Sequence, residues 1–373
     1  MNTNQVSLQV KDGLFKGHAC KLHLQTIDGI PSLLQSITSQ NNTIHSLINL
    51  YPFDFSKQKQ VMQQLAISFT SHIHFPVLLE FYHMAGDFEE IKKMIAQLES
   101  SSCQDDRTWA SLYLLLTRHA FNDITPEELI AASMDIHSTT EEMKLFSMIL
   151  HLYGLHDMEM FDALYKISSH VLLKVENLEN DYLRDAYRTQ LLQIHASSNL
   201  LINQLDVCKE TCKQLLAIGK QQVYPAIYAN VYHALASSYL FTDYTQVLKY
   251  LELAEKTIAH LPFAYIKEKR QNIHNTLSFC NNLWGCSLDK EPDDPSEIAH
   301  QLIKLDKLGE ARFLLETLYE QQGFFTPFQE FYYALATKDK IRLQLAKEKF
   351  SLQSSYFYLQ LFSEKVLKQY NFL

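Results

Sequence analysis

The chain has 373 residues and carries 42 acidic against 33 basic side chains, a formal net charge of −9. This charge argues against the wholesale wrapping of nucleic acid, because a protein that neutralises many phosphates needs a basic surface. Only nine Gly and nine Pro are present, which leaves few residues for the tight turns of sheets, and no sustained alternation of apolar and polar residues predicts a strand. The composition therefore predicts an all-α protein.

The first zone of the chain, residues 1–55, is a candidate helix-turn-helix head. Its predicted elements are an amphipathic stretch at 14–27, a break at Asp28-Gly29, a short helix at 31–37 and another helix at 43–51. Helix, tight turn and helix is the outline of a unit whose second helix enters the major groove. The alternative is an irregular cap over the first repeat, because terminal repeats are often atypical.

The DNA-reading chemistry of this head is sparse. Its three Lys are balanced by three Asp, and it contains no Arg, the residue that most often reads guanine. The whole acidic surplus therefore lies in the rest of the chain, which indicates a division of labour. The side chains that could contact DNA are Lys16, Lys21, Ser32, Gln35 and Ser36.

The second zone, residues 56–290, repeats a helical hairpin phrase. One copy covers residues 78–91, where an apolar helix breaks at Gly86-Asp87 and an amphipathic helix follows. Related phrases end at 155–158 and 241–244 and, in the third zone, at 307–311. Such a hairpin cannot bury its own apolar face, so neighbours must stack. The pattern predicts a right-handed superhelix of tetratricopeptide-like hairpins, whose concave face is lined by the first helix of each hairpin.

Amide and aromatic side chains are the candidate binding groups of this groove. Asn199 and Asn203 are four residues apart, which predicts that they project from the same side of one helix. Asn side chains donate and accept at once, which suits the backbone of an extended peptide, and aromatic residues supply apolar pockets. The alternative is that each Asn is an ordinary solvated or capping residue. The later candidates are Asn230, Tyr239, Phe279 and Asn282, with Glu297 as a possible partner for a free amino terminus.

The third zone, residues 291–373, contains two further hairpins and a final helix. The hairpins are predicted at 296–322 and 327–353, after a segment rich in Asp and Pro at 289–295 that we interpret as a hinge or a domain seam. A single helix is predicted over Tyr356–Tyr370. Because its apolar residues occupy more than one face, it either folds back on the superhelix or pairs with another chain, and we favour a homodimer contact.

The sequence carries no catalytic motif. Gly-rich phosphate loops, HExxH and the nucleophile elbow are missing, and we expect neither an enzyme nor a cofactor. His72 and His74 belong to a turn rather than a metal site. We interpret the six cysteines as thiols in a reducing compartment, although Cys208 and Cys212 could pair or bind metal with outside ligands. No signal peptide or membrane-spanning stretch is visible, so a cytoplasmic location is expected.

The central and C-terminal zones also resemble a known family. The residues that carry the resemblance are 239–244, 277–284 and 297–299, continued at 305–315 and 332–333. The most specific run is Leu-Ser-Phe-x-Asn-Asn-x-Trp at 277–284. In these stretches the chain resembles the arbitrium receptors of Bacillus temperate phages, and the resemblance reaches from about residue 32 to the C-terminus.

This resemblance implies a helix-turn-helix head, a repeat superhelix and a homodimer formed through C-terminal elements. It implies two further partners, a short signalling peptide and operator DNA. Glu297 falls where the family has an acidic residue near the amino end of the peptide, whereas the family's basic residue near Ala226 and Asp near Ser355 are both missing, which implies a different peptide. The predicted peptide-binding set is Asn199, Asn203, Asn230, Tyr239, Phe279, Asn282, Glu297, Thr326, Ser355 and Phe357.

The sequence thus predicts a peptide-regulated transcription factor of a temperate phage that controls the choice between lysis and lysogeny. Its predicted domains are the head at 1–55, the superhelix at 56–290, and the C-terminal repeats with a dimerisation helix at 291–373. Two alternatives remain open. One is a Rap-like peptide sensor that acts on a protein partner, and the other is a repeat scaffold without a ligand.

Overall fold

A computed structural model describes residues 51, 54–68, 75–221, 223–353 and 355–372. The chain divides into two compact units, residues 1–74 and 75–373. In the first unit the described helix is α3 (Phe55–Ser68). The predicted elements of the head at 14–51, and the DNA-contact candidates Lys16, Lys21, Ser32, Gln35 and Ser36, lie outside the described residues, apart from Tyr51.

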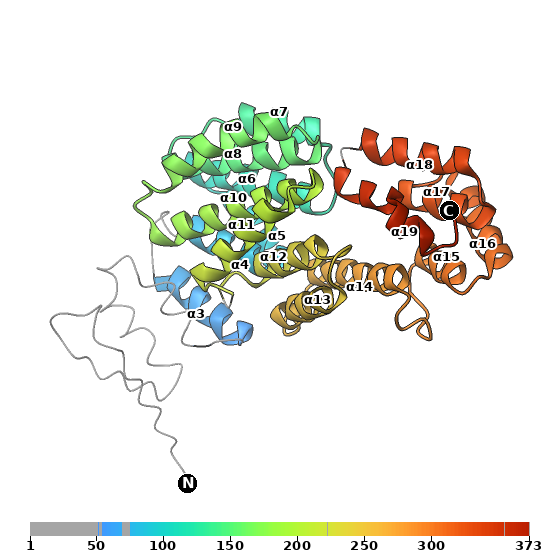
Figure 1. Cartoon of the computed structure of the whole chain (residues 1–373). Coiled ribbons are helices and arrows are strands. Elements are labelled where there is room, and N and C mark those ends of the chain that lie inside the picture. The colour runs from blue at the N-terminus through green and yellow to red at the C-terminus, as the bar shows by residue number, and fades with distance from the viewer. Residues whose placement is uncertain (1–50, 52–53, 69–74, 222, 354, 373) are drawn as a thin grey trace, which may run out of the picture. The chain divides into compact units, whose positions relative to one another are not determined.

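The described part of the second unit consists of helices joined by short turns, which confirms the all-α prediction (Figure 1). The helices are α4 (Phe75–Ala85), α5 (Phe88–Glu99), α6 (Gln104–Ala120), α7 (Pro126–Asp135), α8 (Glu141–Asp157), α9 (Phe161–Val175), α10 (Asp181–Leu201), α11 (Leu205–Ile218), α12 (Pro225–Ser238), α13 (Tyr244–Ile258), α14 (Ala264–Trp284), α15 (Pro295–Lys304), α16 (Leu308–Gln322), α17 (Pro327–Thr337), α18 (Lys340–Leu352), the 3₁₀ helix η3 (Tyr356–Phe362) and α19 (Glu364–Lys368).

The α4–α5 hairpin shows how the sequence builds these pairs. Almost every residue of α4 is buried, so this helix belongs to the core. Gly86 takes a φ of +78° and reverses the chain, a backbone conformation that favours glycine. Asp87 then caps α5, its side chain accepting a hydrogen bond from the Glu90 backbone N–H at 3.3 Å. The hairpins predicted from the repeated phrase are confirmed for α4–α5, α8–α9, α12–α13 and α15–α16.

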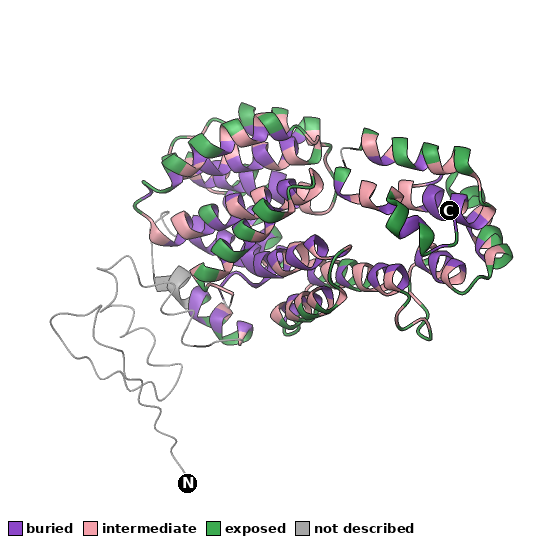
Figure 2. Ribbon diagram, viewed as in Figure 1, coloured by how far each residue is buried: buried purple, intermediate pink, exposed green. Residues whose placement is uncertain are grey.

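The first helices of successive hairpins stack on one another from α4 to α12, and α4 also packs against α10 and α12. A buried carboxylate ties this stack together. Glu80 of α4 accepts hydrogen bonds from Tyr113 Oη of α6 at 2.6 Å and from Gln190 Nε2 of α10 at 2.7 Å. A fully buried carboxyl group is tolerable only when it is hydrogen-bonded. Figure 2 shows the buried residues along the faces where the helices meet.

The C-terminal end of the chain differs from the prediction of one helix over Tyr356–Tyr370. The structure has η3 followed by α19, separated at Ser363, whose backbone is extended at φ −68° and ψ 147°. Ser363 caps α19 by accepting from the Val366 N–H. The break lets the segment fold back on its own chain and bury Phe357, Leu361 and Leu367. The apolar character of this segment therefore no longer argues for a homodimer contact.

Candidate ligand-binding site

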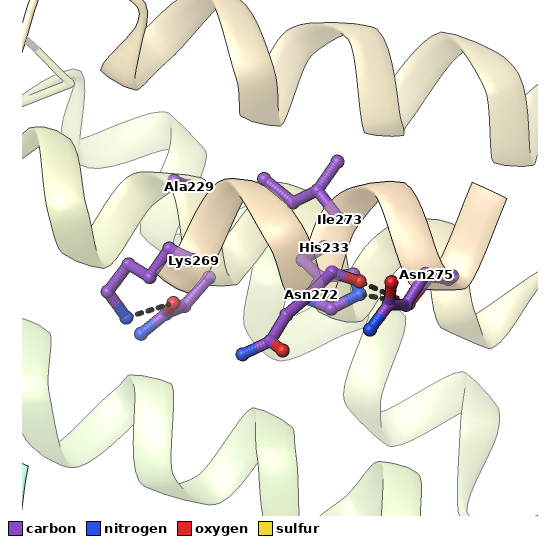
Figure 3. A pocket seen from close by; sticks show the side chains of 8 residues that line it. Ala229, His233, Lys269, Asn272, Ile273 and Asn275 are labelled. Carbon is purple, nitrogen blue, oxygen red and sulfur yellow. Dashed lines mark hydrogen bonds between the residues drawn. The ribbon is translucent and has the colours of Figure 1, made fainter. Parts of the chain in front are cut away.

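A polar cavity of about 340 Å³ lies between α12 and α14, and we call it the α12–α14 cavity (Figure 3). Both helices belong to the row of first helices that was predicted to line the binding groove. Side chains three or four residues apart share one face of a helix, which is why α14 presents several of its residues to the cavity together. The lining residues are Ala229, Asn230, His233, Lys269, Asn272, Ile273, Asn275 and Thr276.

Lys269 is the positive charge of this cavity. Its Nζ donates a hydrogen bond to Asn230 Oδ1 at 2.8 Å and lies 4.6 Å from the centre of the Tyr265 ring. Within the part of the chain that the structure describes, no carboxylate lies at ion-pair distance from it. The ammonium group is therefore held by an amide and an aromatic face, neither of which neutralises its charge.

His233 lines the α12 side of the cavity and is uncharged at neutral pH. Its Nε2 lies 2.7 Å from Thr276 Oγ1, which itself donates to the Asn272 carbonyl at 3.0 Å. Burial, with a smaller contribution from the charge of Lys269, lowers the pKa of His233 to about 4. At neutral pH the cavity thus combines one cation with several amide and hydroxyl groups, a set that can bind peptide carbonyls, amides and an anionic oxygen.

The structure separates the two predicted asparagines at the end of α10. Asn199 is buried, donates to the His195 carbonyl at 2.8 Å, and lines a second cavity of about 980 Å³. Asn203 lies beyond the last helical residue, in the turn before α11, with a φ of +63°. The expectation that both project from one face of a helix was therefore wrong, because the chain reverses after Leu201.

The aromatic candidates have other neighbours. Tyr239 ends α12 and stacks on Tyr250 with ring centres 6.0 Å apart, beneath the Lys209 ammonium group at 4.3 Å. Phe279 of α14 is buried and its ring meets Phe328 edge-on at 5.5 Å. Asn230 is the predicted residue that lines the α12–α14 cavity.

Glu297 of α15 and Asn282 of α14 form part of a buried network. The Glu297 carboxylate accepts hydrogen bonds from Asn282 Nδ2 at 3.0 Å and Tyr332 Oη at 2.6 Å, and lies 3.0 Å from His300 Nδ1. Three helices are thereby joined by one carboxylate. A peptide amino group could bind Glu297 only by replacing one of these internal partners.

The last three predicted residues stand in different local settings. Thr326 caps α17 in a capping box with Gln329. Ser355 precedes η3, and its hydroxyl donates to the Gln353 carbonyl at 3.0 Å. Phe357 is buried in η3. The structure therefore distributes the predicted set over several places instead of gathering it in one groove.

The sequence analysis did not identify the side chains that α14 contributes to the α12–α14 cavity. Lys269, Asn272 and Thr276 follow one another at helical spacing, and a basic residue among amides in an acidic chain was the signal that could have found them. Reasoning from single asparagines favoured α10 instead, because it considered one helix at a time.

The described part of the chain contains neither a cluster of metal-binding side chains nor a membrane-spanning helix. No group of three or more His, Cys, Asp or Glu side chains is arranged to hold a metal ion there. None of its helices combines the length and apolar content needed to cross a bilayer. Cys208 and Cys212 are free thiols buried in the core between α10, α11 and α12.

The comparisons with known proteins identify the family. The model of a family described as AimR transcriptional regulator-like matches residues 58–368. The chain belongs to this family. The AimR transcriptional regulator of Bacillus phage SPbeta is 25% identical over 249 residues, which cover 64% of this chain and 61% of that protein. An uncharacterised Bacillus anthracis protein is 24% identical over 230 residues, 61% of this chain and 85% of that protein.

Two solved structures share the fold of this AimR-like chain. The structure of phAimR with ligand has a TM-score of 0.65 at 16% sequence identity, covering 93% of this chain and 97% of that one. The structure of selenomethionine phAimR has a TM-score of 0.61 at 15% identity, covering 92% and 96%. These likenesses agree with the predicted superhelix of helical hairpins.

Proposed function

We propose that this AimR-like chain is a peptide-regulated transcription factor of a temperate phage. A short signalling peptide binds the groove of first helices, alters the conformation of a homodimer and changes its binding to operator DNA, which decides between lysis and lysogeny. The similarity to the SPbeta transcriptional regulator supports the regulatory part. The similarity to phAimR, one of whose structures contains a ligand, supports the ligand-binding part.

The α12–α14 cavity carries the peptide proposal. An extended peptide exposes carbonyl and amide groups that Asn230, Asn272 and Asn275 can match. Lys269, whose charge no described carboxylate neutralises, suits an anionic group of the peptide, either its terminal carboxylate or an acidic side chain. Asn199 and Tyr239 remain candidates for the more distant walls of the groove.

Regulation requires that the peptide bind one conformation better than the other, because equal affinity shifts no equilibrium. A dimer reads two half-sites at fixed spacing, so a small change in the distance between two heads costs several contacts at once. The head at residues 1–55, with Lys16 and Lys21 as phosphate contacts and Ser32, Gln35 and Ser36 near the bases, is proposed to supply those contacts.

Calorimetry with a synthetic peptide tests the cavity. The peptide is taken from the C-terminus of a short secreted-peptide gene next to the gene of this chain. Lys269→Met should weaken binding by at least tenfold, about 1.4 kcal/mol. Lys267→Met is the matched control, because Lys267 is exposed on the same helix. Equal affinities of the two variants would remove Lys269 from the site.

Retardation of phage promoter fragments tests the transcription-factor part. The ligand-free protein should retard an operator fragment with an affinity that falls steeply as salt rises, and the peptide should change that affinity. If no neighbouring phage DNA is retarded while the peptide still binds, the chain is a sensor that acts on a protein partner, the Rap-like alternative. If neither binds, the scaffold alternative stands.

A further inference from the structure

The 3₁₀ helix η3 connects parts of the second unit that are far apart in sequence (Figure 1). Its Gln360 Nε2 donates to Asn203 Oδ1, in the turn after α10, at 3.1 Å. Its Phe357 ring meets Phe241, in the turn after α12, edge-on at 5.3 Å. We call these two contacts the η3 joint, because they link the C-terminal hairpins to the central repeats.

On its other side η3 is held by many aromatic contacts. The Tyr358 ring lies 4.8 Å from Phe328 of α17 and 5.8 Å from Phe350 of α18. Phe362 meets Phe331 at 5.3 Å. These rings pack around the α17–α18 hairpin, so η3 belongs firmly to the C-terminal part of the unit.

A second connection between the same parts lies at α14 and α15. Asn282 is buried and donates to both the carbonyl and the carboxylate of Glu297. Lys304 Nζ donates to the Leu283 carbonyl at 3.2 Å, and Phe279 packs against His300. This interface is buried and crossed by charged hydrogen bonds, which are the costly ones to break.

The two connections are therefore unequal. At the η3 joint Asn203 is exposed, so water competes for its hydrogen bond. The joint has one exposed hydrogen bond and one aromatic pair, in which Phe357 is buried and Phe241 is half-buried, whereas several buried hydrogen bonds cross the α14–α15 interface. A structure opens first where few buried contacts hold it. The η3 joint should therefore open while α14 and α15 stay together.

We propose that η3 is a detachable strap that closes the C-terminal hairpins α15–α18 against the turns at Asn203 and Phe241 in the ligand-free chain. When the strap releases, the hairpins swing about the α14–α15 interface, a hinge motion of packed elements. Release also removes Tyr356 from the rim of the 980 Å³ cavity between α9, α10 and α11, so the same motion widens that cavity. The strap concerns the ligand-free chain and does not depend on the proposed peptide or DNA.

Hydrogen exchange on the ligand-free full chain tests the strap. The variant Asn203→Gly with Phe241→Ala removes both partners of η3 from the central side, and Gly retains the left-handed backbone at position 203. Exchange of residues 355–363 should accelerate about tenfold, equivalent to ~1.4 kcal/mol. Residues 273–283 and 297–303, which form the α14–α15 interface, should be unchanged.

The matched control is Asn122→Gly with Phe324→Ala. Asn122 also has a positive φ in a turn, and Phe324 is an exposed ring in the turn between α16 and α17. This variant should leave residues 355–363 as in the parent chain. Gln360→Ala, which breaks the hydrogen bond from the other side, should accelerate the turn at 202–204, whereas a purely local role of Asn203 would leave that turn unaffected.

Two results would overturn the strap. Unchanged exchange at 355–363 in the double variant would show that the joint does not hold η3. Equal acceleration at 297–303 would show that the two parts loosen together, so that no separate joint exists. Circular dichroism of each variant confirms that the helices are retained.

Discussion

At the scale of single residues, the same residue type can be either a ligand contact or an internal bond, and burial decides which. Glu297 has the charge to hold a peptide amino group, yet its carboxylate meets three internal groups. Lys269 has the complementary charge and lacks a described carboxylate partner. The partners of Glu297 lie up to 35 residues away in the chain, so spacing along one helix could not reveal them.

Replacing Glu297 with Ala should therefore destabilise the fold. The loss of a carboxylate that several buried groups share should lower the free energy of unfolding by about 1–3 kcal/mol. Urea unfolding measures this change, with Glu310→Ala as a control because Glu310 is exposed and its ion pair is long. Unchanged stability together with lost peptide binding would restore Glu297 to the peptide site.

His233 should make stability depend on pH. Its pKa in the folded protein is about 4, below its ordinary value of 6.5. As pH falls below 6.5 the unfolded chain takes up a proton that the folded chain refuses, so stability falls between pH 6.5 and pH 4. His233→Gln should reduce this loss by on the order of 1 kcal/mol between pH 6.5 and 5 in urea titrations. If the free energy of unfolding changed equally with pH in the parent protein and in His233→Gln, the lowered pKa of His233 would be contradicted.

At the scale of secondary-structure elements, the turns determine how the hairpins stack. Gly86 allows the α4–α5 turn to approach the start of α14, where an added Cβ would lie 2.9 Å from Ile266 Cδ1 and 3.0 Å from Tyr265 Cδ1. That contact joins the α4–α5 turn to α14, two segments that lie far apart along the chain. A close approach of this kind requires both the absent side chain and the positive φ.

The change Gly86→Ala should therefore cost about 2 kcal/mol or more, from backbone strain and overpacking together. Gly309→Ala is the control, because nothing lies within 4 Å of its added Cβ and the residue is helical. That control should be neutral or stabilising by up to ~1 kcal/mol. Thermal unfolding of the two variants measures the difference, and similar midpoints would contradict the close approach.

At the scale of the whole molecule, the proposed homodimer needs a surface other than the folded-back C-terminal segment. The side chains of Ile341 and Leu352 on α18 are 83% and 84% exposed. Their spacing of eleven residues places them on one face of the helix, and Phe313 of α16 is 73% exposed. We propose that the exposed apolar side chains of α18, with Leu345 between them, form the homodimer contact.

Sedimentation velocity tests this face. The variant Ile341→Asp with Leu352→Asp should shift the protein from dimer toward monomer, because charges would have to be buried in the contact. Its thermal midpoint as a monomer should be unchanged, since both residues are exposed. Met134→Asp on α7, which is 71% exposed, is the control. Equal sedimentation of both variants would place the dimer contact elsewhere.

The sequence by itself determined the local features of this protein. Apolar spacing and turn residues such as Gly86 and Asp87 specified the hairpins, because helix periodicity and capping act within a few residues. The runs at 239–244, 277–284 and 297–299 together indicated the family, and 277–284 was the most specific of them. The break of the final helix at Ser363 was not visible locally, because the rings of η3 pack against α17 and α18, which precede it in the chain.

Only the tertiary structure decided which side chains were free to bind. Asn203 turned out to bond Gln360, which is 157 residues away, and Lys269 was brought beside Asn230 from a different hairpin. Superhelical stacking creates such neighbours, and their identity depends on how the helices pack rather than on spacing within one helix. Side-chain chemistry was therefore readable in the sequence, whereas its partners were set by the packing of distant helices.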